Sequence, residues 1–145
     1  MAPTYYLPVS GSQPSFGMRR LIHITVFLAG LAVILLGARY AIARESLRQA
    51  DLPGLYQQIN QESFNGTLTD ATVEWWELPE DYGDTRFYSD GRVEIRIDRD
   101  SVTDEEQLTE TMRHEMCHVA THEEVVRLHQ DDHGELFQRC MGRFE

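Results

Sequence analysis

The longest continuous hydrophobic stretch of the chain runs from Leu21 to Ala38, with the sequence LIHITVFLAGLAVILLGA. Its apolar residues would lie on all sides of a helix instead of forming one stripe, so the segment is poorly suited to covering a soluble core. A run of about 18 apolar residues is close to the minimum that spans a bilayer. We therefore predict that residues 21–38 insert into a membrane as a transmembrane helix.

Two interpretations of this hydrophobic segment are open. In the first, residues 18–43 form a permanent anchor of a single-pass membrane protein. In the second, Met18 is the true start, residues 18–43 are a signal peptide cleaved after Ala43, and the product is secreted or periplasmic. We favour the anchor because residues 1–17, which we expect to be a disordered tail, form a long preceding segment rich in Pro, Ser, Gly and Tyr. Arginines flank both ends of the segment, so the positive-inside rule leaves its orientation open.

The pattern changes at about Glu45 to the amphipathic periods of a soluble domain, residues 45–145. Its first part carries apolar residues at helical spacing, namely Leu52, Leu55, Tyr56, Ile59 and Phe64. The following Asn65-Gly66 is a typical helix end, because both residue types adopt the left-handed conformation easily. We therefore predict one helix that ends near residue 64.

Alternating polar and apolar residues predict a small sheet after this helix. Thr72–Trp76 resembles a first strand, and Glu77–Asp84, with its proline and glycine, resembles a loop. Arg86–Ser89 and Arg92–Asp98 flank Asp90-Gly91, a sequence that favours a tight hairpin. The fold class predicted is α+β, with a three-stranded sheet packed on a helix.

That helix is predicted to begin at Thr103, an N-cap candidate with Glu106 three residues later as its capping-box partner. Residues at helical spacing continue from Leu108 to Val119. Glu123–Gln130 has an ambiguous pattern, and Glu135–Arg143 can form a short last helix.

The second helix carries the sequence His114-Glu115-Met116-Cys117-His118. Residues four apart lie on one face of a helix, so His114 and His118 can bind one metal ion. Zinc prefers such imidazole ligands and strongly lowers the pKa of a bound water molecule. Glu115 lies beside the two histidines and can act as general base and general acid in peptide hydrolysis.

A catalytic zinc also needs a third protein ligand and an open position. His122 lies a further turn along the same helix, where a straight helix cannot easily bring it to the same ion. His133 is the better candidate because Gly134 allows the chain to turn back. Other candidates follow the predicted helix, namely His129, Asp131 and Asp132.

The stretch HEMCHVATHEEVVRLHQDDHGELF resembles the SprT-like metallopeptidase family. In that family a His-Gly-x-x-Phe segment follows the motif helix and supplies the third zinc ligand, which here corresponds to His133. Ile59-Asn60, the segment from Phe64 to Leu68, and the strand from Val93 to Ile97 are similar to upstream parts of the family. The resemblance covers roughly residues 50–143.

The resemblance implies a small zincin-like fold with Zn²⁺ as cofactor and a protein or peptide as substrate. It also implies that the substrate lies along an exposed strand edge, which we expect to be that of Val93–Ile97. The best-known relatives act near DNA, whereas this chain has a membrane segment and no second cluster of zinc-binding cysteines.

Charge separates the two parts of the chain. All 24 acidic residues lie from Glu45 onward, against nine arginines, which gives the domain a formal charge of about −15. Such a surface repels phosphate backbones, so binding to nucleic acid is not expected. The simplest interpretation of this charge is a soluble acidic surface.

The sequence therefore predicts a membrane-associated zinc endopeptidase with His114, His118 and His133 as ligands and Glu115 as catalytic residue. The alternative is a non-catalytic, membrane-tethered binding module that zinc stabilises. Cys117 and Cys140 are expected to be small buried residues, and they can form a disulfide if the domain lies in an oxidising compartment. Tyr88 is a candidate for stabilising the oxyanion, although no sequence feature places it at the site.

Overall fold

The computed structural model describes the backbone of residues 16–144 and the side chains of residues 27–144. Most of the predicted tail, residues 1–17, lies outside these described residues. The chain divides into two compact units, residues 1–41 and residues 42–145.

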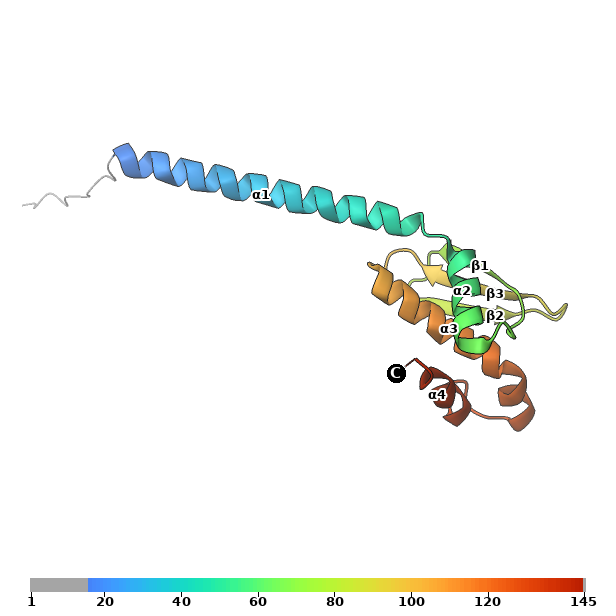
Figure 1. The fold of residues 1–145 in the computed structure, drawn as a ribbon. Coiled ribbons are helices and arrows are strands. Elements are labelled where there is room, and N and C mark those ends of the chain that lie inside the picture. The colour runs from blue at the N-terminus through green and yellow to red at the C-terminus, as the bar shows by residue number, and fades with distance from the viewer. Residues whose placement is uncertain (1–15, 145) are drawn as a thin grey trace, which may run out of the picture. The chain divides into compact units, whose positions relative to one another are not determined.

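The first helix, α1, spans Phe16–Arg48 (Figure 1). Within its part Phe27–Arg48, the most apolar 18 residues have a mean hydropathy of 1.6, and 0% of them are buried. By length and composition this helix can cross a membrane, and an N-terminal signal sequence meets the same criterion.

The second unit begins with the last two turns of α1, and the helix predicted from the apolar face follows. This helix, α2, spans Leu52–Phe64. The Asp51 side chain caps its start by accepting a hydrogen bond from the Gly54 N–H at 3.0 Å. Asn65 ends it in the left-handed conformation, with φ 55°, which confirms the predicted helix end.

The sheet contains three strands, β1 (Ala71–Trp76), β2 (Gly83–Phe87) and β3 (Val93–Asp98), in the order β1-β3-β2. β3 pairs in parallel with β1 and antiparallel with β2. The expectation that Val93–Ile97 offers an exposed edge is therefore wrong, because β3 is the central strand. β2 precedes β3 in the chain and is the last strand of the order on that side, so β2 forms an outer edge of the sheet.

β2 begins at Gly83, within the segment predicted as a loop. Its sequence, GDTRF, lacks the apolar alternation that marks a half-buried strand, which explains why the prediction placed the strand later. The predicted hairpin is confirmed. Gly91 has φ 89°, and its N–H donates to the Tyr88 carbonyl at 3.0 Å.

The motif helix, α3, spans Glu105–Leu128, so the ambiguous segment after residue 122 continues the helix almost to its end. The prediction of Thr103 as N-cap is wrong by one residue. Asp104 caps the helix by accepting from the Gln107 N–H at 2.9 Å, and the Gln107 side chain accepts from the Thr103 N–H at 3.0 Å. Gln107 therefore takes the part that was expected of Glu106.

The core lies between the sheet and the helices. Ile95 and Ile97 of β3 are fully buried and pack in one cluster with Tyr56 of α2 and with Met112 and Met116 of α3. The last helix, α4 (Glu135–Met141), confirms the predicted short helix and packs on α3 (Figure 1).

Asp98, at the end of β3, fixes the two loops beside it. Its side chain is 2% exposed and accepts hydrogen bonds from three backbone N–H groups, those of Leu78 at 2.7 Å, Asp100 at 3.1 Å and Ser101 at 2.6 Å. Burial alone would raise the pKa of Asp98, but these donors lower the pKa below its usual value.

Replacing Asp98 by alanine should lower the free energy of unfolding by roughly 2–4 kcal/mol, because buried donors would lose a charged acceptor. The lowered pKa means that this stabilisation is present above the unfolded pKa of about 4 and is lost as the pH falls through the folded value. Urea denaturation of the full chain in mild detergent should show a gap between wild type and variant that shrinks in acid. An equal gap at pH 7 and in acid would contradict this account, and Asp70→Asn, at an exposed position, is the control.

Candidate metal centre

Three histidine side chains meet at one point of the second unit. His114 and His118 lie one turn apart on α3, and His133 lies in the turn before α4. The Nε2 atoms of His114 and His133 are 3.1 Å apart, and those of His118 and His114 are 3.3 Å apart. The candidate ligand atoms of all three residues lie within 4.8 Å of one another.

This spacing fits a tetrahedral zinc ion. A zinc–nitrogen distance of about 2.0–2.1 Å places two ligand nitrogens about 3.3 Å apart in that geometry. Burial lowers the pKa of His118 to about 4, and the charges of His114 and His133 add to the effect. Burial, followed by the charge of His133, also lowers the pKa of His114. These two rings are therefore neutral near pH 7 and offer the lone pairs that a cation requires.

The turn that carries His133 is held by short-range contacts. α3 ends at Leu128, and its C-cap His129 has φ 52°. The Asp131 side chain accepts from the His133 N–H at 2.8 Å. A side chain at Gly134 would place its Cβ 2.9 Å from the Asp131 carbonyl oxygen, so the close approach favours glycine.

The other candidate ligands have different positions. Asp131 bonds within the turn, and His129 caps α3. His122 stacks on Phe87, with ring centroids 3.5 Å apart and an interplanar angle of 8°. Asp132 lines the cleft beside the three histidines but is not a member of their group.

Phe137 packs against all three histidine rings. It is 3% exposed, and its ring centroid lies 4.8 Å from that of His114, 4.6 Å from that of His118 and 4.7 Å from that of His133. In the sequence, Phe137 stands out only as the last residue of the His-Gly-x-x-Phe segment. Its position at helical spacing after Gly134 was the available sign that it turns inward.

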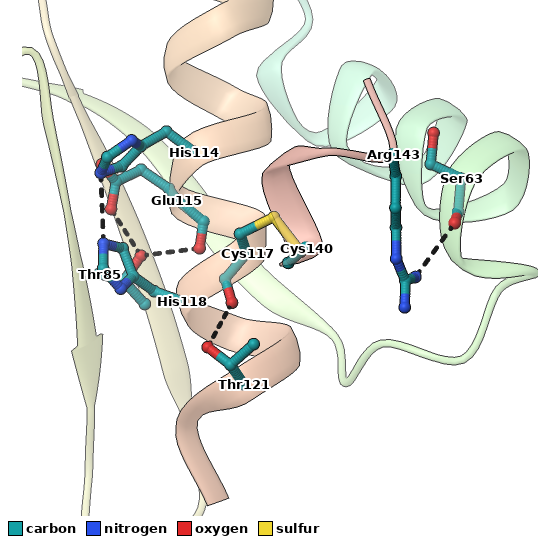
Figure 2. Close-up of a disulfide and its surroundings, with 9 residues drawn as sticks. All are labelled: Ser63, Thr85, His114, Glu115, Cys117, His118, Thr121, Cys140 and Arg143. Carbon is teal, nitrogen blue, oxygen red and sulfur yellow. Dashed lines mark hydrogen bonds between the residues drawn. A yellow bond between two sulfur atoms is a disulfide. The ribbon is translucent and has the colours of Figure 1, made fainter. Parts of the chain in front are cut away.

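A disulfide joins α4 to the motif helix. Cys117 and Cys140 are bonded, and both side chains are buried (Figure 2). The bond lies on the side of α3 away from the histidine pair, because a residue one position before His118 is turned off the face that His114 and His118 share. It therefore fixes the helix that carries Phe137 and follows His133.

Glu115 lies between the histidines and the sheet. It is 4% exposed, and its Oε2 accepts a hydrogen bond from the Thr85 hydroxyl of β2 at 2.8 Å (Figure 2). Burial raises the pKa of Glu115 to about 7. The Thr85 hydrogen bond opposes this rise, and the charges of Asp84 and Asp81 add to it. Such a pKa suits a group that accepts and returns a proton near neutral pH.

The close approach of β2 to α3 depends on Gly83. A Cβ at this position would lie 2.9 Å from Thr111 Cγ2 and 3.0 Å from Glu115 Oε1. Thr111 is itself buried, so it has little room to move. No local sequence pattern marks Gly83 or Thr85 as part of a site, because both act through a contact with a distant helix.

A cleft of about 1140 Å³ lies over these residues, between β2 and α3. Its walls include the acidic residues Glu80, Asp81, Asp84, Glu110 and Asp132, and a single arginine, Arg113, within the described part of the chain. Tyr88 is not among the lining residues. Its hydroxyl instead donates to Glu94 at 2.6 Å, so the suggested oxyanion role has no support in this geometry.

The fold is an α+β domain in which three imidazoles converge from one helix and from the turn after it. A buried glutamate lies beside them. This arrangement is typical of a metal centre carried on a helix. The chain belongs to the SprT-like family, whose sequence profile matches residues 52–145. No curated protein sequence matches the chain.

Replacing His133 by alanine should weaken zinc binding by more than about 100-fold. Removing a residue that only hydrogen-bonds to a zinc ligand lowers affinity by about 10–100-fold, and removing the ligand itself should lower it further. Competition with a chromogenic chelator measures this affinity. His129→Asn is the matched control, since asparagine tolerates the left-handed conformation at the end of α3. Equal zinc affinity of the two variants would remove His133 from the ligand set.

Proposed function

We propose that this protein is a zinc-dependent metalloendopeptidase. The observation that carries the proposal is a buried glutamate placed directly beside three converging imidazoles, at the base of a cleft. Membership of the SprT-like family supports protein substrates.

In this mechanism His114, His118 and His133 would hold a zinc ion, which would supply Lewis-acid polarisation of water and of the substrate carbonyl. Glu115 takes one proton from a water molecule while the water oxygen bonds to the carbonyl carbon. As the bond between carbonyl carbon and nitrogen breaks, Glu115 gives this proton to the leaving amine. Each turnover thus returns Glu115 to its starting protonation state.

The outer edge of β2 is the proposed docking line for the substrate backbone. The Tyr82 carbonyl accepts from the Asp98 N–H, and the Tyr88 N–H donates to the Arg92 carbonyl. In an antiparallel ladder, every second residue of a strand bonds to the neighbouring strand and the residues between point the other way. Tyr82 and Tyr88 bond on the side of β3, so the backbone groups of Gly83, Thr85 and Phe87 point away from β3. All three residues line the cleft, so an extended peptide can add there as a further strand.

The length of the cleft supports internal cleavage of a chain. Its lining residues on α3 run from Gln107 to Val126, about 28 Å along the helix. This distance accommodates about eight residues of an extended peptide. A substrate segment can therefore extend on both sides of the three histidines, as an endopeptidase requires.

Replacing Glu115 by glutamine should lower the rate of peptide cleavage by at least about 10²–10⁴-fold, because the variant cannot accept the proton. Zinc content should stay at one equivalent, since Glu115 is not a ligand. Cleavage of an unfolded protein substrate and metal analysis of the same samples measure both quantities. Undiminished cleavage would contradict the mechanism, and four protein ligands in metal-edge spectra would favour the non-catalytic module.

We propose further that α1 is a permanent anchor and that the second unit lies in an oxidising compartment. The apolar composition of α1 supports the first part. The Cys117–Cys140 disulfide supports the second, since such bonds persist outside reducing compartments. Arginines flank both ends of the apolar segment, so the positive-inside rule does not give the orientation of the protein in the membrane. The disulfide is therefore the better guide to the side on which the second unit lies.

Cell fractionation with sequencing of the mature N-terminus tests the anchor. The protein should stay in the membrane pellet after alkaline carbonate extraction and keep its residues before Ala43, because an uncleaved apolar helix of this length holds it in the bilayer. A soluble product that begins at Arg44 would establish cleavage and remove the anchor. Thiols that react with an alkylating agent before reduction would contradict the proposed compartment.

A further inference from the structure

Thr85 contacts the candidate catalytic glutamate from the opposite element of the fold. We propose that Thr85 is a positioning residue, which fixes the Glu115 carboxylate against β2 so that one oxygen stays available for proton transfer. The catalytic consequence rests on the proposed function. The contact itself does not, and it can be tested in a protein that cleaves nothing.

The Thr85 hydroxyl reaches both ends of Glu115. It lies 2.8 Å from the side-chain Oε2 and 3.2 Å from the backbone carbonyl oxygen of the same residue (Figure 2). The hydroxyl has one proton to donate, and a charged carboxylate is the stronger acceptor. The Thr85 oxygen thus holds the end of the side chain close to its own backbone and limits its rotation.

The second carboxylate oxygen, Oε1, is left free by the same arrangement. It faces Gly83, where any Cβ would come within 3.0 Å of it. No other side-chain hydrogen bond to Glu115 occurs among the described residues, and Gly83 lines the cleft. The strand therefore binds one oxygen and makes room for the other, which is the oxygen left to accept the proton from water.

Thr85 also connects the glutamate to the proposed docking line. Its backbone N–H and C=O point away from β3, toward the outer edge of β2, while its side chain points to α3. A peptide that pairs with this edge would bond to the same residue that holds Glu115. Thr85 alone would then fix the distance between the docked substrate backbone and the Glu115 carboxylate. Precise positioning of reacting groups strongly affects the catalytic rate.

The test compares three variants of the full chain in mild detergent, loaded with zinc. Thr85→Val keeps the shape of the side chain but removes the hydroxyl, and Thr85→Ser keeps the hydroxyl. Thr109→Val is the matched control, because the Thr109 hydroxyl bonds to the Glu105 carbonyl on α3, outside the cleft.

Thr85→Val should lower kcat by about 10–100-fold, with KM within about twofold of wild type, because the lost contact affects the reacting geometry and not docking. Thr85→Ser should stay within about threefold of wild type, as should Thr109→Val, and all three should bind zinc with unchanged affinity. A Ser variant as poor as the Val variant, or a Val variant with full kcat, would overturn the proposal.

A second measurement needs no activity. In the metal-free protein, Thr85→Val should lower Tm by about 5 °C when Glu115 is present, because a buried carboxylate loses its donor. The same substitution should have little effect in a Glu115→Met background. If the wild-type protein has no peptidase activity but the Tm shifts are non-additive, the proposed function is rejected and the Thr85–Glu115 contact is retained. Additive Tm shifts would overturn the positioning role, whether or not the protein cleaves peptides.

Discussion

The candidate site depends on the close contact between β2 and α3. Gly83 allows the two backbones to approach, and Thr85 then reaches Glu115 across the gap. The buried core beneath them, where Ile95 and Ile97 meet Met112 and Met116, fixes how the helix lies on the sheet. Because protein interiors are close-packed, a shift of this interface would displace the glutamate and the docking strand together.

A single helix supplies both the core and the site because of its period. Met112 and Met116 face the sheet and are fully buried. His114 and His118, four residues apart, lie on another face of the helix, which is turned toward His133. His133 depends on a separate set of contacts. The Asp131 side chain holds its turn, Phe137 supports the rings, and the disulfide fixes α4 to α3.

Much of the fold and the grouping of the three histidines could be predicted from the sequence because both follow from local patterns. Helical spacing places His114 and His118 on one face, and a capped start identifies the helix. The edge strand was placed wrongly because GDTRF shows no alternation and because strand order is a non-local property. Thr85 had no signal for the same reason. Its contact with Glu115 forms only when a strand and a helix bring together residues 30 apart in sequence.

The state of Glu115 argues for chemistry over a purely structural zinc site. A rise in its pKa from an ordinary value of 4.5 to about 7 corresponds to roughly 3 kcal/mol against the charged form, a cost that a stable fold does not need. An apolar residue at this position would pack against the sheet without that cost. A structural site would also close its fourth position with another protein ligand, whereas the group in the described residues has three histidines. A costly buried carboxylate beside three converging histidines suits the proposed hydrolysis, whereas stability alone would disfavour it.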